Sequence, residues 1–254
     1  MDGITGMLMG MRSNHGDFDP ARRIERETLD VVLRAAVAAP TASNLQQYSI
    51  IVVSDKGVME RLGFGHFRKA DVMLVFNADC RRLALMFEAS GAKRPELGLR
   101  WFLTSLMDVM FCARNAAIAA HSFGIDSCFS NGLLNKLENA VTELAIPEMV
   151  VPVGALFLGY PPEGKRDKPK RGRLFEEGIV MHHRYSDYST NHLGRAIERY
   201  NDPREGFTIP PLTEEMSDAV KWIAEKWLRM VPPDDDLLLA LERTGFARLT
   251  VRKE

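Results

Sequence analysis

The sequence has 254 residues, enough for one large domain or two small ones with a buried core. Lys and Arg number 33 against 34 for Asp and Glu, so the formal charge of −1 produces no overall field that favours nucleic acid. The widely spaced Cys80, Cys112 and Cys128 show no metal-ligand spacing and suit a reducing compartment. Residues 1–11 are too short for a signal peptide and no apolar run reaches membrane-spanning length, so a cytoplasmic protein with no membrane partner is expected.

Apolar periodicity predicts a mixture of helices and strands. An amphipathic helix over residues 27–38 stops before Pro40, because proline disfavours helical geometry in the residue that precedes it. A strand rich in β-branched residues follows at 48–53. The longest helical pattern, 100–123, is apolar nearly all round and is therefore expected in the core. The other expected elements are helices at 3–11, 55–62 (capped by Asp55), 82–89, 133–144, 188–200, 214–230 and 234–243, and strands at 72–76 and 150–159.

A loop of small polar residues separates the helix at 27–38 from the strand at 48–53. It contains Pro40, Thr41, Ala42, Asn44 and Gln46. Short side chains allow backbone N–H groups and hydroxyls to approach a ligand closely, and Gln46 adds an amide donor and acceptor. The composition suits a planar ligand with polar edges, although most loops of this composition are only turns.

This loop resembles the flavin-binding loop of the nitroreductase family, in which a helix runs into A-P-S-x-x-N-x-Q-P-W and then a strand. Pro40, Thr41, Asn44 and Gln46 stand at the matching positions, with Thr41 in place of the usual serine. The dipeptide Gln-Tyr at 47–48 replaces the family's Pro-Trp pair.

The segment R-S-N-H-G-D-F at residues 12–18 is similar to the family's R-S-x-R-x-F. Arg12 and Ser13 match, His15 stands where an arginine is usual, and Gly16 is a one-residue insertion. The resemblance implies that Arg12, Ser13 and His15 hold the ribityl-phosphate of the flavin. A neutral histidine holds a phosphate less firmly than a guanidinium does.

The helix at 100–123 and the segment after it resemble the family's central helix and the turn that follows it. The residues in register are Asp108, Ala113, Asn115, Ala119, Ala120, Gly124 and Ser127. In relatives the backbone of the following turn passes over the isoalloxazine ring, which assigns that role here to Cys128, Phe129, Ser130 and Asn131. Ser130 or Asn131 is also expected to cap the next helix.

Residues 164–173, G-K-R-D-K-P-K-R-G-R, form the one concentrated basic run. A solvated loop, a nucleic-acid patch and an anion clamp are all compatible with such a run, but the near-neutral total charge and the lack of interleaved aromatics argue against nucleic acid. The family ends this loop with two basic side chains on the flavin phosphate. Arg171 and Arg173 match that pattern, and paired guanidiniums suit a doubly charged phosphate. Residues 179–183 would then form a strand that adds to a partner's sheet.

The resemblance covers about residues 11–185 and identifies the sequence as a member of the nitroreductase family. It implies an α+β fold in which helices, including a long core helix, flank a central mixed β-sheet. It also implies FMN bound at a homodimer interface, with the 12–15 segment from one protomer and the 40–46 loop from its partner. The implied function is that of an oxidoreductase that takes hydride from NAD(P)H and reduces a nitroaromatic, quinone or related small-molecule acceptor. The flavin carries this chemistry, so neither a catalytic side chain nor a metal is predicted.

We expect an FMN-binding domain over residues 1–200 and a helical C-terminal extension over 201–254 that packs on the same domain or on its dimer partner. Two alternative functions stay open. Relatives with the same fold include dehalogenases, dehydrogenases and a flavin-fragmenting enzyme. The replacements at His15 and at 47–48 are also compatible with a flavin-binding protein that has lost catalysis.

Overall fold

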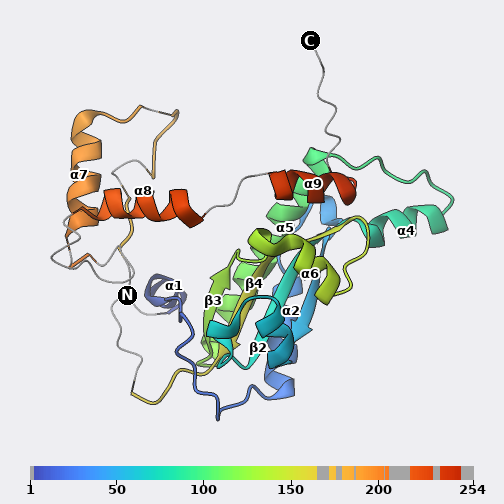
Figure 1. Cartoon of the computed structure of the whole chain (residues 1–254), viewed down its shortest axis with the longest axis horizontal. Helices are drawn as coiled ribbons and strands as arrows, with labels where there is room; N and C mark the ends of the chain where they lie inside the picture. The colour runs from blue at the N-terminus through green and yellow to red at the C-terminus, as the bar shows by residue number, and fades with distance from the viewer. Residues whose placement is uncertain are drawn as a thin grey trace. The chain divides into compact units, whose positions relative to one another are not determined.

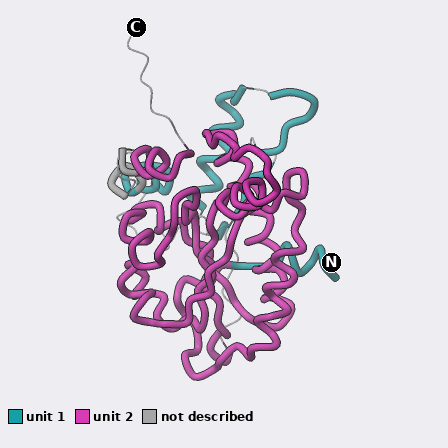
Figure 2. Tube along the Cα trace, turned by 90° about the vertical axis from the view of Figure 1, so that its right-hand side faces the viewer, with its two compact units in different colours: residues 1–12, 167–232 teal, residues 13–166, 233–254 magenta. Residues whose placement is uncertain are grey.

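The structure, a computed structural model, describes residues 3–164, 172–175, 179–185, 187–202, 204–205, 218–230 and 235–246. The chain forms two compact units (Figure 2). One comprises residues 1–12 and 167–232, and the other residues 13–166 and 233–254. The expected boundary at residue 200 follows a different division and stays a prediction.

The unit of residues 13–166 and 233–254 is built on a four-stranded sheet with the order β1-β2-β4-β3 (Figure 1). Its strands are β1 (Tyr48–Val53), β2 (Val72–Asp79), β3 (Asp126–Ser130) and β4 (Val150–Gly159). Every neighbouring pair of these strands is antiparallel. Among the described strands the sheet is therefore antiparallel and not mixed as expected. The chain reverses direction between β1 and β2 and between β3 and β4, and the central pair β2–β4 is antiparallel as well. An isolated parallel bridge joins Ser13 to Ser127.

Helices cover both faces of this sheet. On one face α5 (Leu99–Ser122) packs with α2 (Arg26–Val37) and contacts all the strands. On the other face Phe157 of β4 stacks on Phe67 with ring centroids 4.0 Å apart, and Phe64 meets Phe157 edge-on at 5.1 Å. The other helices are α1 (Ile4–Gly10), α3 (Lys56–Arg61), α4 (Arg81–Ala89), α6 (Leu137–Glu143), α7 (Thr190–Asn201), α8 (Ala219–Met230) and α9 (Asp235–Arg243).

The strands β1 and β4 have the predicted bounds, and the predicted helices of the described residues form with ends shifted by a few residues. Asp55 caps α3 as expected: its carboxylate accepts hydrogen bonds from Gly57 N at 2.7 Å and Val58 N at 3.1 Å. The expected start of α8, residue 214, lies outside the described residues.

Three local predictions are wrong. The strand expected at 72–76 continues to Asp79, because the amide of Asn77 finds partners on Ser49 and does not end the strand. The expected turn that includes residues 128–131 belongs to β3 as far as Ser130, since residues 128–130 pair with residues 155–157 of β4.

The third correction concerns the helix expected at 133–144, which begins as a separate 3-10 turn, Leu134–Lys136, before α6. No side chain caps the N-terminus of the 3-10 turn or that of α6, and Ser130 Oγ instead accepts a hydrogen bond from Gly132 N at 3.2 Å. Residues 179–183 form a turn and bends within this chain. Their pairing with a partner's sheet stays a prediction.

The long helix α5 has a buried face and an exposed face, whereas the sequence pattern suggested burial nearly all round. Its buried residues are Phe102, Ser105, Asp108, Val109, Cys112, Ala113, Ala116, Ala117 and Ala120. The exposed apolar residues Leu99, Leu103, Met107, Met110 and Phe111 recur at helical spacing and form a stripe, here called the α5 stripe. Within the described residues α5 is the one helix long and apolar enough to cross a membrane, and it packs as the core helix of this unit.

Candidate functional site

The loop that precedes β1 is anchored by a buried carboxylate of α5. Asp108 is 1% exposed, and its Oδ1 accepts a hydrogen bond from Ala42 N at 2.8 Å. Its Oδ2 accepts one from Gln47 N at 3.2 Å. The two oxygens therefore hold both ends of the candidate loop against the core helix, and their bonds to N–H groups compensate the burial of the charge.

The backbone of this loop adopts a conformation that L-residues seldom take. Ser43, Asn44 and Gln46 have φ angles of 51°, 56° and 53°, in the left-handed region. The carbonyl of Gln46 accepts a hydrogen bond from the Arg82 guanidinium of α4. Such a conformation persists only where its surroundings hold it, and the contacts of Asp108 and Arg82 supply that restraint.

Thr41 provides the observation that points to a ligand. Its Oγ1 is buried and has no hydrogen-bond partner within the described part of the chain. Buried hydroxyls in folded proteins nearly always have a partner, so an unpaired one in a loop of left-handed residues fits a polar group that the chain itself does not contain. Pro40, Ser43, Asn44 and Gln46 are exposed beside it. These residues fit the polar edge of a flavin.

The departure from the family's Pro-Trp pair has a structural role. Proline at position 47 would have no N–H to donate to Asp108, whereas Gln47 donates it. The buried side chain of Gln47 also accepts hydrogen bonds from Ser105 Oγ at 3.4 Å and Cys80 Sγ at 3.6 Å. Burial, followed by the neighbouring Cys112, raises the pKa of Tyr48 to about 12, so its phenol stays neutral.

A second candidate segment, at residues 13–18, is held against the start of β3. Asn14 N donates to Ser127 O at 2.9 Å, and Asn14 Nδ2 donates to Asp126 Oδ2 at 3.0 Å. Its Oδ1 accepts a hydrogen bond from Asp17 N at 2.8 Å. Asn14 thus fixes the two flanking candidates, Ser13 and His15, beside the segment that begins at Cys128.

His15 and Cys128 lie in contact, with 3.6 Å between Nδ1 and Sγ. Burial raises the pKa of the Cys128 thiol to about 11, so at neutral pH the sulfur is protonated and is not a thiolate nucleophile. The inserted Gly16 has φ of 92°, and a Cβ there would stand 2.7 Å from His66 O. Only glycine fits this turn, which explains why the inserted residue is a glycine.

The predicted ring-contacting residues occupy the end of β3 and the chain after it. Phe129 is partly exposed, Ser130 is half-buried and Asn131 is exposed. The 13–15 and 128–131 segments therefore form one group within the chain.

The structure does not bring this group together with the 40–46 loop. Tyr48, which follows the loop, pairs with Ala78, which pairs with Val151 of β4. Ser127, beside Ser13, pairs with Leu158 at the other end of β4. Residues 151 and 158 of one strand are about 23 Å apart at the usual rise per residue. The chain thus carries two separate groups of candidate residues.

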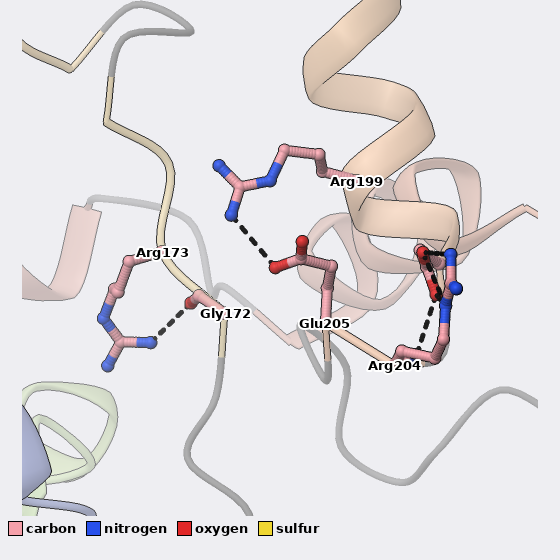
Figure 3. Close-up of polar contacts among 6 residues, drawn as sticks. Gly172, Arg173, Arg199, Arg204 and Glu205 are labelled. Carbon is pink, nitrogen blue, oxygen red and sulfur yellow. Dashed lines mark hydrogen bonds and ion pairs between the residues drawn. The ribbon is translucent and has the colours of Figure 1, made fainter.

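The basic candidates Arg12 and Arg173 belong to the compact unit of residues 1–12 and 167–232. Arg173 is exposed, and its Nη1 donates to Gly172 O at 2.8 Å (Figure 3). In the same unit Arg199 pairs with Glu205 at 2.9 Å. Arg171, the other member of the predicted clamp, lies outside the described residues.

Among the described residues, no group of three or more His, Cys, Asp or Glu side chains is arranged to hold a metal ion. The adjacent His182 and His183 have ring centroids 6.5 Å apart.

Comparison with known proteins assigns the chain to a protein family. The family model described as the nitroreductase family matches residues 9–64, a stretch that includes Arg12, Ser13 and the 40–46 loop. The chain is 30% identical over 182 residues to the FMN reductase (NADPH) of Bacillus subtilis strain 168, which covers 69% of this chain and 72% of that protein. The chain belongs to the nitroreductase family.

Two further relatives agree with this assignment. The oxygen-insensitive NADPH nitroreductase of Salmonella typhimurium is 30% identical over 201 residues, 76% of this chain and 79% of that protein. The solved structure of the NfrA1 nitroreductase from B. subtilis superposes with a TM-score of 0.81 at 24% identity, covering 96% of this chain and 99% of that one. The fold is therefore the nitroreductase fold.

Sequence reasoning assigned no site role to Asp108, Asn14 or Arg82. An Asp within an otherwise apolar helix is a signal for Asp108, since a buried charge requires partners. Asn14 stands two residues before Gly16, a pattern typical of a side chain that bonds its own turn. Nothing in the sequence singles out Arg82, which reaches Gln46 only through the fold.

Replacing Asp108 by Asn tests the anchor. An asparagine retains one acceptor oxygen and turns an NH₂ group toward a backbone N–H, so one loop amide loses its partner. We expect the D108N variant to be less stable by about 1–3 kcal/mol in urea unfolding. In D108N, hydrogen exchange should accelerate at the amides of Ala42 and Gln47 and stay unchanged at the amides of β3. The control variant D30N, which changes an exposed aspartate, should leave exchange at all these amides unchanged. Unaltered exchange in the loop would show that Asp108 does not hold it.

Proposed function

We propose that the protein is an FMN-dependent oxidoreductase that uses NAD(P)H to reduce small-molecule acceptors such as nitroaromatics or quinones. The observation that carries this proposal is the 40–46 loop of a chain in the nitroreductase family. The loop is strained and anchored by Asp108, and its buried Thr41 hydroxyl has no partner among the residues that the structure describes. The names of its relatives, an FMN reductase and an NADPH nitroreductase, supply the cofactor and the electron donor. Bound FMN supplies the two-electron transfer from NAD(P)H to the acceptor.

The candidate residues then divide by role. Pro40, Thr41, Ala42, Asn44 and Gln46 bind the polar edge of the ring. The backbone of Cys128, Phe129, Ser130 and Asn131 lines its face. The ribityl-phosphate is held by Arg12, Ser13, His15, Arg171 and Arg173. No side chain is assigned a catalytic proton, because the cofactor performs the chemistry.

We further propose that the protein acts as a homodimer in the cytoplasm. Ser13 and the 40–46 loop lie about 23 Å apart along the strands, and Ser130, opposite Ala155, is still about 13 Å from Val151 along β4 and three strand positions from β1. One isoalloxazine ring does not span both groups, but a two-fold axis can bring one group from each copy together. The α5 stripe supports this arrangement, because exposed apolar side chains at regular spacing on a core helix are typical of an interface.

Cofactor content and steady-state kinetics test the function. The purified protein should be yellow and release FMN on denaturation, and with either NADH or NADPH it should reduce a quinone or nitroaromatic without added flavin. Bound FMN with no NAD(P)H oxidation would indicate the non-catalytic flavin-binding alternative. A colourless protein that does not bind added FMN would contradict the proposal itself.

The phosphate clamp is tested by comparing FMN with riboflavin. R173A should weaken FMN binding by about ten- to a hundredfold, because a charge-assisted hydrogen bond is lost, and should hardly change the affinity for riboflavin, which has no phosphate. The matched control R195A removes an exposed arginine of α7 in the same compact unit and should affect neither ligand. Equal weakening of both ligands by R173A would place Arg173 outside the phosphate site.

Complementation tests the shared site. Mixing a T41V protomer with an R173A protomer should give mixed dimers in which one site carries both substitutions and the other carries neither. The intact site should bind FMN with the wild-type affinity. Differently tagged subunits allow the mixed species to be isolated. Absence of recovery in an isolated mixed dimer would show that each site lies within one chain.

A further inference from the structure

A pocket separate from the candidate flavin residues opens beside the sheet face that α5 does not cover. It has a volume of about 500 Å³, within the range of small-molecule sites. Its apolar wall comes from α4, from the chain after α6 and from the strands, and includes Ile51, Leu85, Met86, Leu144, Ile146 and Val150. Leu85 and Met86 are 49% and 56% exposed, so an apolar surface is open to solvent there.

A buried amide with an unused acceptor forms part of this wall. Asn77 of β2 is 0% exposed and lines the pocket. Its Nδ2 donates to Ser49 O at 3.3 Å and Ser49 Oγ at 3.2 Å, while its Oδ1 is buried with no partner among the described residues. Because Ser49 O only accepts, the amide cannot be turned round, and the unpaired atom is a hydrogen-bond acceptor.

A β-bulge lies in the strand that pairs with Asn77. The register of β2 against β4 shifts between Phe76 and Asn77, and Asn77 pairs with Pro152. A bulge turns a side chain out of the regular alternation of a strand and commonly occurs beside binding sites. Phe76 pairs with Gly154, so the extra residue of this bulge is Val153 of β4, next to the residue that pairs with Asn77.

Arginines give the pocket a positive rim. Arg81 and Arg82, at the start of α4, both line it, and neither forms an ion pair with a carboxylate of the described chain. The guanidinium of Arg82 already donates to Gln46 O, which leaves Arg81 as the available cation. Asp79 also lines the pocket, with its Oδ1 accepting from Arg81 N at 2.9 Å, so the three charged groups sum to a positive charge.

We propose that this pocket is a second ligand site, which binds a small organic anion with an apolar body and an N–H or O–H group. The apolar wall takes the body, Arg81 pairs with the anionic group, and Asn77 Oδ1 accepts the hydrogen bond. The site does not require the flavin, and its failure would leave the proposed oxidoreductase function untouched.

Matched probes test the three recognition elements in the wild-type protein as purified. Indole-3-acetate carries an aromatic body, a carboxylate and an N–H. 1-Naphthaleneacetate lacks the N–H, and 3-methylindole lacks the carboxylate. Isothermal titration should give saturable binding of indole-3-acetate, with each of the other probes weaker by about tenfold or more, as expected for the loss of a hydrogen bond or of a charged contact.

Variants then place the probe in this pocket. R81Q should lower the affinity for indole-3-acetate by about tenfold and leave the affinity for 3-methylindole unchanged. A89W should fill the cavity and lower the affinity for both probes. R68Q, which removes an exposed arginine away from the pocket, is the control for lost charge. N77L should weaken indole-3-acetate to the level of 1-naphthaleneacetate, and circular dichroism checks that it folds.

Two outcomes would overturn the proposal. One is the absence of saturable binding of all three probes up to about 1 mM, and the other is binding that A89W and R81Q do not change. Because the comparison of probes uses the wild-type chain, a variant that fails to fold does not prevent a decision.

Discussion

The candidate site depends on one buried carboxylate. Asp108 lies in the middle of the core helix and accepts hydrogen bonds from two backbone N–H groups, Ala42 N and Gln47 N. Without these bonds the three left-handed residues between them would relax, because isolated left-handed L-residues are unfavourable. The loop is therefore held in place by a helix that is itself packed in the core. The geometry of the candidate site therefore depends on the same helix that packs against the sheet.

The burial of the sheet on both faces separates the site into two groups. Helices α2 and α5 cover one face, and the Phe64–Phe67–Phe157 aromatic cluster packs on the other, so neither group of candidate flavin residues lies across the middle of the sheet. The 40–46 loop lies at one end of β4 and the 13–15 segment at the other. In the proposed homodimer a second copy of the chain completes the site, and the α5 stripe is an exposed apolar surface available for that contact.

The departures from the family pattern have local structural reasons. Gln47 supplies an N–H that a proline lacks, and its side chain bonds to Ser105 and Cys80. His15 contacts the neutral thiol of Cys128 in a turn that Gly16 alone permits. These replacements are accommodated by the surrounding core, and they do not by themselves indicate a degraded site.

The sequence by itself determined the elements and the family. The strands at 48–53 and 150–159, the cap at Asp55 and the long helix depend on local patterns of apolar and small residues, which act over a few neighbours. The extension of β3 through Cys128 to Ser130 was decided by pairing with β4, which no local pattern encodes. Only the tertiary structure showed that Asp108 holds the loop, that the two groups of candidate residues lie apart, and that Asn77, beside a pocket, has an oxygen without a partner among the described residues. Each of these depends on contacts between residues distant in the chain, and such contacts exist only once the sheet and its helices have packed.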